Sequence, residues 1–489
     1  MSPHRRSAPP RPPAPVPATP EYVTLAVGAP AHGGHCIARP VDDPSGRIVF
    51  VRHALPGEQV RAVMTEKNAK IWRADAVEIL SASPDRVRPV WAEAGPGGVG
   101  GGELSHVALP AQRTWKRWVL ADCLRRIGGA PVVEAVSALP GAEGGAVPVE
   151  PMPGEAAAEA DPDPRVRARA GTGTRTRISL AVTESGEAGM HGFRSGTVLP
   201  VHELPLAVGA IQDLGLTERA LWRKHFRPGM RVDAVAPSAG EPLVLLEDGG
   251  RSSRALTVLT ATGRATGRRR VAEVVDAAGL GLGELHYSVH ATGFWQAHRE
   301  APTVLVDRVV RGALAEEPTA SGTRPGDGPL DAARMAGARV LELYSGAGLF
   351  TLPLVALTGA VRSLEGSGRA VADARRTLHE YAGAELTAGR VTPAAVAQLG
   401  RFGTGGPSGG DGADVVVLDP PRQGAGRGII QAVAALNPRR VVMVACDPAA
   451  LARDLGAFLG SGYRLAAMSA LDMFPHTHHF ETIAVLQRD

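Results

Sequence analysis

The chain has 489 residues, 44% of them hydrophobic, and is long enough for two or three domains with cores of their own. No apolar run reaches the roughly 20 residues of a transmembrane helix, and the start of the chain lacks the apolar stretch of a signal peptide. We therefore expect a cytoplasmic protein with no membrane contact. A formal net charge of +4 is compatible with an anionic partner, and three cysteines are too few for a disulfide framework or a four-thiolate metal site.

The amino-terminal part of the chain predicts a tail and a small barrel. Residues 1–20 are rich in proline and arginine, which is typical of a disordered basic tail. Residues 21–81 contain five short strand patterns separated by Gly, Pro, Asp and Asn turns, as in an OB-like barrel. Basic residues, histidines and glycines fall near the expected loop ends, so we expect nucleic-acid binding. A protein-interaction barrel with an ordinary solvated surface is the alternative.

The middle of the chain, residues 82–290, predicts a mostly β domain. Helical periodicity at residues 110–127 is followed by low complexity at residues 141–174, which predicts a flexible insertion. Short strand patterns then return. Two more low-complexity patches, residues 316–328 and 403–412, predict surface loops.

Residues 291–489 predict a Rossmann-like α/β domain. From residue 339 onward, four short apolar runs are each followed by a turn and a helical stretch, which is typical of a parallel doubly wound sheet. Ligands of such folds bind beyond the carboxyl ends of the strands. The candidate residues Tyr344, Glu365, Asp419 and Cys446 all lie at such ends, whereas Glu481 does not.

The first of these strands enters its helix through a glycine turn. Gly346 and Gly348 stand in the run Leu-Glu-Leu-Tyr-Ser-Gly-Ala-Gly-Leu-Phe, where absent side chains let the backbone approach a nucleotide. A nicotinamide site or a plain tight turn would fit this turn as well. The next strand ends at Glu365, close to where a ribose-binding carboxylate is expected, about 20 residues after the glycines. Together they predict a cofactor that contains a nucleoside.

Two later strand ends carry a carboxylate and a thiol. Asp419 precedes two prolines and Arg422, and the prolines fix the backbone that holds the carboxylate over the cofactor pocket. A solvated aspartate in a plain loop is the alternative. Cys446 precedes Asp447, a good N-cap, and Pro448, so it lies at a helix amino end whose partial positive charge stabilises a thiolate. Its place beside the cofactor crevice favours a nucleophile over a buried structural cysteine.

Three histidines precede the last strand. His476, His478 and His479 suggest a metal site, but the remaining ligands would have to come from elsewhere in the chain, so we expect no metal.

In this order the pieces resemble the RNA uracil-C5 methyltransferases that carry an amino-terminal TRAM domain. The resemblance covers most of the chain. It rests on the barrel at residues 21–81, Phe294-Trp295-Gln296, the cofactor glycines, Glu365, Asp419 to Arg422, Cys446, and His-Phe-Glu ending at Glu481. It implies that S-adenosylmethionine contacts Gln296, Tyr344, Gly346, Gly348, Glu365 and Asp419. It also implies that Cys446 is the nucleophile, Glu481 the general base, and Phe294 and Arg422 substrate contacts, with Phe294 packed on a flipped uracil.

The chemistry of uracil agrees with these residues. Carbon 5 is a poor nucleophile, and addition of a thiolate to carbon 6 gives an enolate that can attack a methyl sulfonium. A base must then remove the proton from carbon 5 so that the thiolate can leave. The target base must leave its stack to reach such a pocket. The Asp-Pro-Pro-Tyr and Pro-Cys motifs of adenine and cytosine methyltransferases are absent, which favours uracil.

The chain departs from the family at its cluster-binding positions. Many relatives hold an iron–sulfur cluster with four cysteines, and the matching residues here are Trp91, Val99, Gly102 and Leu204, so we expect no cluster. Glu342, Ser345 and Asp447 replace commoner Asp, Cys and Asn without removing a proposed catalytic atom.

The resemblance also suggests a substrate. In this family a TRAM domain usually accompanies ribosomal substrates, so the analogy favours 23S ribosomal RNA over transfer RNA. We also expect the enzyme to be a monomer. A transfer RNA methyltransferase and a non-catalytic RNA-binding protein with a degenerate methyltransferase domain are the alternatives.

Overall fold

The computed structural model describes residues 20–248, 256–314, 330, 335, 337–403 and 411–488. The predicted tail up to residue 19, the predicted loop at 316–328, and residues 404–410 of the other predicted loop lie outside them. The chain forms two compact units, one of Met1–Ala108 with Met190–Leu199 and one of Leu109–Gly189 with Pro200–Asp489. No helix among the described residues is long and apolar enough to cross a membrane.

The first unit contains a closed barrel of five strands in the order β1-β2-β3-β5-β4, which confirms the predicted barrel. The strands are β1 (Tyr22–Ala31), β2 (His35–Pro40), β3 (Val49–Arg52), β4 (Gln59–Lys67) and β5 (Trp72–Ser81). Side chains alternate between the interior and solvent along β4, as expected of a barrel strand. Residues 83–108 follow the barrel, with a short 3₁₀ helix η1 (Ala92–Ala94).

The middle of the chain is mostly β, as the sequence predicts. It forms a sheet of six strands and a separate antiparallel pair, β13 and β14. The six strands are β7 (Arg177–Val182), β8 (Ala188–His191), β9 (Val198–Pro200), β10 (Arg231–Val235), β11 (Leu243–Glu247) and β12 (Leu256–Thr260). The pair is β13 (Arg270–Asp276) and β14 (Glu284–His290), and short helices are α5 (Gly209–Gln212), α6 (Ala220–Arg223) and η3 (Ala278–Leu280).

A helical region opens the second unit, where the sequence predicts one helix and a flexible insertion. Its elements are α1 (Leu109–Cys123), the π-helix η2 (Leu124–Gly128), α2 (Ala130–Ser137), β6 (Val149–Pro151), α3 (Pro153–Ala160) and α4 (Pro164–Arg167). Residues 141–174, predicted as the insertion, therefore contain a strand and two helices rather than one unstructured loop. Strand β6 joins the edge of the main sheet, parallel to β20.

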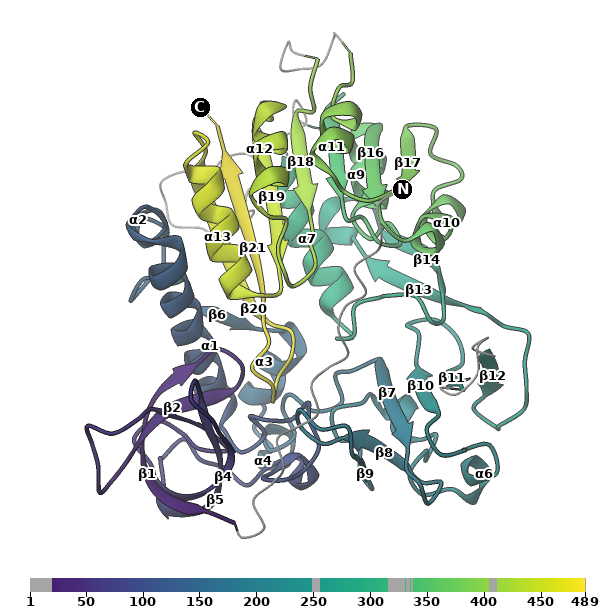
Figure 1. Ribbon diagram of the computed structural model, residues 1–489. Coiled ribbons are helices and arrows are strands. Elements are labelled where there is room, and N and C mark those ends of the chain that lie inside the picture. Colours follow the sequence, from purple (N-terminus) through teal and green to yellow (C-terminus); the bar gives the residue numbers. More distant parts are fainter. Residues whose placement is uncertain are drawn as a thin grey trace, which may run out of the picture. The chain divides into compact units, whose positions relative to one another are not determined.

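The carboxyl-terminal part is a doubly wound sheet of eight strands in the order β17-β16-β15-β18-β19-β21-β20-β6, as predicted (Figure 1). The strands are β15 (Arg339–Leu343), β16 (Ala360–Glu365), β17 (Ala384–Ala388), β18 (Val415–Leu418), β19 (Arg440–Ala445), β20 (Arg464–Asp472) and β21 (Glu481–Gln487). β15, β18 and β19 are buried along their whole length, which explains their continuous apolar sequence.

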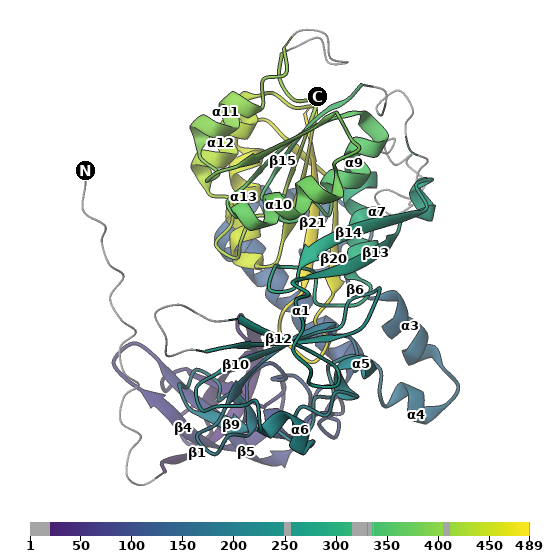
Figure 2. The ribbon, with the colours of Figure 1, turned by 90° about the vertical axis from the view of Figure 1, so that its right-hand side faces the viewer.

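Helices cover both faces of this sheet (Figure 2). One face carries α7 (Ala301–Leu314), α9 (Thr351–Thr358) and α10 (Gly368–Thr377). The other carries α11 (Pro393–Leu399), α12 (Arg427–Ala435) and α13 (Pro448–Leu459). Each layer buries its own apolar core against the sheet, one around Val306, Val309 and Val310 of α7 and one around Leu455 and Phe458 of α13.

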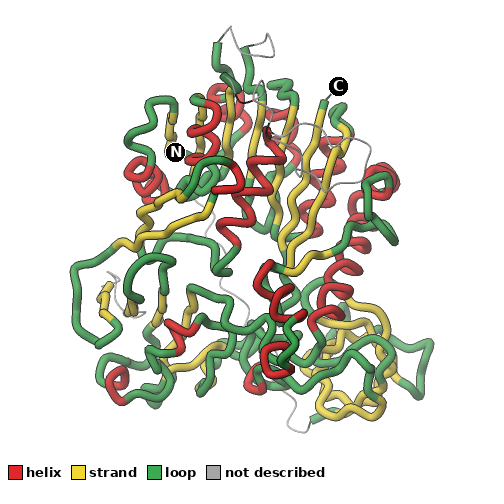
Figure 3. The backbone as a smooth tube through the Cα atoms, turned by 180° about the vertical axis from the view of Figure 1, so that it is seen from behind, coloured by secondary structure: helices red, strands yellow, loops and turns green. Residues whose placement is uncertain are grey.

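The strand directions decide what meets at the ligand-binding edge. β16, β15, β18 and β19 run parallel, whereas β21 runs antiparallel to β19. Figure 3 shows strands of this sheet side by side, in yellow. The amino end of β21 therefore lies beside the carboxyl end of β19. Because of this reversal, Glu481 reaches the same edge as the ends of the parallel strands.

Candidate active site

Five predicted site residues form a row along this edge of the sheet. The paired strands place them in the order Glu365 at the end of β16, Tyr344 after β15, Asp419 after β18, Cys446 after β19 and Glu481 at the start of β21. Two hydrogen bonds continue the pairing beyond the strands, from Tyr344 N to Leu364 O at 2.8 Å and from Asp419 N to Leu343 O at 3.3 Å. Residues far apart in the sequence are thus brought to neighbouring positions.

The glycine turn lies at the Glu365 end of the row. The Glu365 carboxylate accepts hydrogen bonds from Gly346 N at 3.0 Å and Ser367 N at 2.6 Å, which fixes it beside the turn. Gly346 has φ +55°, and a Cβ added there would meet no atom within 4 Å, so open space lies over the backbone. Tyr344 also has positive φ, +63°, a conformation that costs a non-glycine residue energy and clusters at ligand sites. A fixed carboxylate and an open glycine turn suit a nucleoside cofactor.

A buried glutamate lies beneath this turn. Glu342 of β15 accepts a hydrogen bond from Thr351 Oγ1 at 2.5 Å, and its Oε1 is buried with no hydrogen-bond partner. Burial raises the pKa of Glu342 to about 8, so the carboxyl is mostly protonated at neutral pH. In the sequence Glu342 stands out only as a replacement for Asp, because the residue pattern does not reveal how completely β15 is enclosed.

Cys446 and Glu481 lie next to each other on paired strands. Ala445 pairs with Thr482, and Thr482 Oγ1 donates a hydrogen bond to Ala445 O at 2.8 Å, so the residues that flank this pair on the edge side are Cys446 and Glu481. Glu481 is buried, with Oε1 lacking a hydrogen-bond partner, and Cys446 is partly exposed. A thiol and a carboxyl oxygen without a hydrogen-bond partner therefore lie together at one end of the row.

The predicted helix cap next to Cys446 is present. Asp447 is the N-cap of α13, its side chain accepts from Ala450 N at 2.8 Å, and Pro448 occupies the first turn. The cap fixes the point at which β19 ends and α13 begins. Cys446, the residue between them, is held at the amino end of the helix.

The charges around Cys446 oppose the predicted stabilisation of a thiolate. Burial and the neighbouring carboxylates of Glu481 and Asp419 raise the pKa of Cys446 to about 12, against the lowering effect of Arg422. The helix end alone therefore does not make the thiol acidic. The prediction overlooked the two carboxylates because sequence does not show that they face the sulfur.

Asp419 and Glu481 of the row hold their protons more strongly than ordinary carboxyl groups. Burial and the nearby Glu365 raise the pKa of Asp419 to about 7. Burial and Asp419 raise the pKa of Glu481 well above its usual range, whereas Arg422 lowers it. Perturbed carboxyls of this kind cluster where proton transfer occurs. Arg422 is the cation that favours ionisation of both Cys446 and Glu481.

Phe294 and Gln296 come from a different segment, the loop between β14 and α7. Phe294 is 75% exposed, the most exposed large hydrophobic side chain among the described residues, whereas Gln296 is 8% exposed. Thr176 holds the loop through hydrogen bonds from its N at 2.7 Å and its Oγ1 at 3.0 Å to Ala297 O. An exposed phenyl ring is available for stacking on a base.

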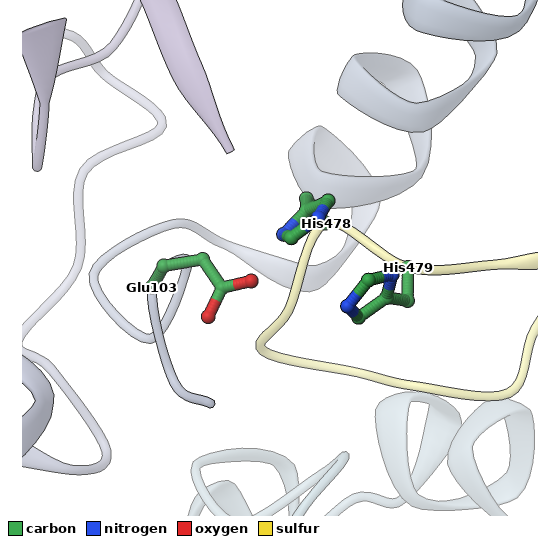
Figure 4. A group of neighbouring side chains, drawn as sticks. All are labelled: Glu103, His478 and His479. Carbon is green, nitrogen blue, oxygen red and sulfur yellow. The ribbon is translucent and has the colours of Figure 1, made fainter. Parts of the chain in front are cut away.

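The three histidines do not act together. Both ring nitrogens of His476 lie at hydrogen-bond distance from other groups, Nδ1 at 3.1 Å from Gln112 Nε2 and Nε2 at 3.3 Å from Ala170 O. The rings of His478 and His479 stack with centroids 3.9 Å apart (Figure 4; Glu103, also drawn there, belongs to the first unit). A three-histidine metal site is therefore not supported.

Comparison with known proteins finds RNA methyltransferases. A family model described as tRNA (Uracil-5-)-methyltransferase matches residues 328–489. A Streptomyces avermitilis protein named as an uncharacterized RNA methyltransferase is 37% identical, covering 96% of this chain and 98% of its own. The 23S rRNA (uracil(1939)-C(5))-methyltransferase RlmD of Alkalilimnicola ehrlichii is 30% identical, covering 96% of this chain and 97% of its own.

The chain belongs to the RNA uracil-C5 methyltransferases. The Pyrococcus abyssi tRNA (uracil-54, C5)-methyltransferase, solved in complex with S-adenosyl-L-homocysteine, has the same fold as this methyltransferase. It aligns with a TM-score of 0.56 at 21% identity and covers 94% of this chain and 99% of that one. The expected family and fold class are thus confirmed.

The residues of this methyltransferase do not fit a four-cysteine iron–sulfur cluster. Its three cysteines belong to separate elements: Cys36 to β2, Cys123 to α1 and Cys446 to the row. Trp91 is buried, and a Cβ on Gly102 would lie 2.7 Å from its ring, so the indole fills the space beside that position. The absence of a cluster stays a prediction, supported by this donor set.

Proposed function

We propose that this enzyme methylates carbon 5 of a uridine in 23S ribosomal RNA with S-adenosylmethionine, through covalent addition of Cys446 to carbon 6. The observation that carries the proposal is the pairing of β19 with β21, which sets the Cys446 thiol beside the Glu481 carboxylate at the cofactor edge. A nucleophile and a base that act on adjacent carbons of one ring need such proximity.

The residues of the row have distinct tasks in this reaction. Glu365 and the turn at Gly346 hold the nucleoside part of S-adenosylmethionine, together with Gly348, Tyr344, Asp419 and Gln296. When bound, S-adenosylmethionine supplies the methyl group and a positive sulfonium, whose charge favours the ionised forms of Asp419 and Cys446. Phe294 packs on the flipped uracil and Arg422 contacts the substrate.

Covalent addition proceeds with balanced bonds. The Cys446 thiolate forms a bond to carbon 6, and the ring electrons move to the carbonyl oxygen at carbon 4 as an enolate. Carbon 5 then takes the methyl group as the bond between the methyl carbon and the sulfonium sulfur breaks, and S-adenosylhomocysteine is the leaving group. Glu481 removes the proton from carbon 5, the double bond reforms, and the bond between sulfur and carbon 6 breaks. Glu481 must be ionised to accept that proton. Arg422 favours the ionised form, and burial makes the ionised carboxylate a strong base.

Ribosomal RNA is supported by two RlmD relatives. The proteins of Alkalilimnicola ehrlichii and Chromohalobacter salexigens, named as 23S rRNA uracil-1939 methyltransferases, are both 30% identical to this chain over 96% and 94% of its length. Transfer RNA is the second candidate, favoured by the name of the Pyrococcus abyssi protein that shares the fold.

The barrel supports an RNA partner of either kind. Lys67 and Arg47 lie over the ring of Trp72 at 4.7 and 5.7 Å, and Arg61 lies over the ring of Tyr22 at 4.6 Å. Tyr22 is half exposed. Cations beside accessible aromatic rings are the combination that binds phosphates and stacks on bases.

The nucleophile is tested by trapping an adduct. With S-adenosylmethionine and a 23S ribosomal RNA transcript that contains 5-fluorouridine, we expect a protein–RNA adduct that survives denaturing electrophoresis, because fluorine replaces the proton that a base must remove. Cys446→Ala should abolish the adduct, and retention of the adduct would overturn the nucleophile assignment. Glu481→Gln should accumulate adduct even on the uridine transcript, whereas unimpaired turnover would reject its role as base. A transfer RNA transcript tested in parallel decides the substrate class.

A further inference from the structure

The loop that leads into Glu481 is held by α1, a helix that lies far from this loop in the sequence. Residues 473–480, here called the base loop, join β20 to β21, so the conformation of this loop sets where β21 begins and where the carboxylate of Glu481 lies. Two side chains of α1, Gln112 and Lys116, contact the base loop and its preceding residue. Spaced four residues apart, they share one face of the helix.

Lys116 fixes the beginning of the loop. Its ammonium group donates a short hydrogen bond to the carboxylate of Asp472, the last residue of β20, and a second to Phe474 O at 3.1 Å. The side chains of Lys116 and Asp472 are 0% and 3% exposed. A charge buried this deeply persists only with a well-placed partner, so the pair fixes one geometry.

Gln112 fixes the middle of the loop through two reciprocal hydrogen bonds. The backbone N of His476 can only donate, and it lies 2.7 Å from Gln112 Oε1, which orients the amide. The other end of the amide, Nε2, then donates to His476 Nδ1 at 3.1 Å. His476 Nε2 consequently carries the ring proton and donates to Ala170 O at 3.3 Å. Burial lowers the pKa of His476 to about 4, which keeps the ring neutral in this arrangement.

The backbone at His476 needs this support. His476 has φ +66°, a left-handed backbone conformation that is uncommon for residues other than glycine, although asparagine, aspartate and histidine adopt it more often than the rest. On its other side, Gly171 has φ +77°, and a Cβ there would lie 2.8 Å from His476 Nε2. The site around the ring is therefore shaped to hold one strained loop conformation.

We propose that Gln112 and Lys116 are positioning residues that hold the base loop so that Glu481 meets the carbon 5 proton. This inference rests on the proposed function, because it assigns α1 a role in the last step of that reaction. We call Gln112, Lys116 and the base-loop residues that they contact the clamp. Gln112 and His476 lie 364 residues apart in the sequence, so the clamp joins the start of the second unit to its catalytic end. Neither residue touches the reacting atoms.

Two assays measure proton removal separately from the earlier steps of the reaction. For Gln112→Met, we expect turnover on uridine RNA to fall by about 10-fold or more, because small displacements of a catalytic group have effects of this size. Adduct formation with 5-fluorouridine RNA, which needs no base, should stay within about 2-fold of the wild type. The RNA probes are total RNA from cells that lack the enzyme and the same RNA prepared from cells grown with 5-fluorouracil.

Two further variants keep the test decisive. His476→Asn tolerates positive φ but loses the ring bonds, so it should show the same split if Gln112→Met does not fold. Thr114→Ala, on the exposed side of α1, should change neither rate. If both rates fall in proportion for the folded clamp variants, their role is structural only and the positioning inference fails. If the wild type forms no 5-fluorouridine adduct, or Cys446→Ala still forms one, the proposed function itself fails.

Discussion

At the scale of single residues, the active site concentrates carboxyl groups that do not ionise easily. Glu342 and Asp419 both have raised pKa values because the sheet edge encloses them and other carboxylates lie nearby. Such a site is unfavourable for the fold without a cation and favourable for binding one. The sequence could nominate Asp419 from the two prolines after it, but its burial depends on the surrounding chain and could not be read from that motif.

Asp419 gives a pH-dependent prediction. Its pKa of about 7, against an ordinary value of 3.8, means that the folded state favours the protonated form. The contribution of Asp419 to the free energy of unfolding is therefore fully present below about pH 4 and is lost as the pH rises through 7. Asp419→Asn should therefore raise the free energy of unfolding at pH 8 by on the order of 2–4 kcal/mol, with little change at pH 4. Urea denaturation of the enzyme without S-adenosylmethionine measures this difference.

The same substitution should weaken cofactor binding, so titration calorimetry with S-adenosylmethionine gives a second readout. Glu385→Gln is the control, because its exposed carboxylate pairs with Arg362 at the surface and contributes little. Equal stability of Asp419→Asn and the wild type at pH 8 would show that the carboxyl is not destabilising.

At the scale of elements, the parallel strands were predictable and the reversal of β21 was not. Continuous apolar runs identify β15, β18 and β19 because both of their faces are buried. Nothing in the last strand's composition states its direction, and this direction brings Glu481 to the edge. The short helices α3 and α4 were also missed, because helices of 8 and 4 residues are too short to show a clear helical period.

The helix α13 offers a test of the cap beside the nucleophile. Asp447→Ala removes the hydrogen bond to Ala450 N and should lower the free energy of unfolding by about 1 kcal/mol. We also expect slower adduct formation with 5-fluorouridine RNA, because Cys446 directly precedes the cap. Asp447→Asn should restore both properties, since asparagine caps helices as well as aspartate does.

Thr392→Ala is the matched control for this test. Thr392 caps α11 in the same way, through a side-chain bond from Ala395 N at 3.2 Å, but it follows β17, which three strands separate from β19 and Cys446. Its loss should reduce stability to a similar extent without slowing adduct formation. Equal slowing by both substitutions would attribute the effect to stability alone.

At the scale of the whole molecule, the chain combines a barrel unit with a larger catalytic unit. The barrel was predictable because its five strands alternate and end in turn residues. The boundary between units was harder to see, since residues 190–199 return to the first unit, where the guanidinium of Arg52 lies 3.7 Å from the ring centroid of Phe193. Such a return depends on tertiary packing, which local sequence patterns do not show.

The composition of the whole chain predicts an enzyme that works without iron. A four-thiolate cluster needs one more cysteine than the three that the chain contains, and these three lie on separate elements. Protein produced with ample iron and sulfide should hold no stoichiometric iron by elemental analysis and show no absorption band near 400 nm. Its activity should be the same after aerobic and anaerobic purification. A band that disappears on reduction or chelation together with activity would contradict the prediction and would require donors other than cysteine.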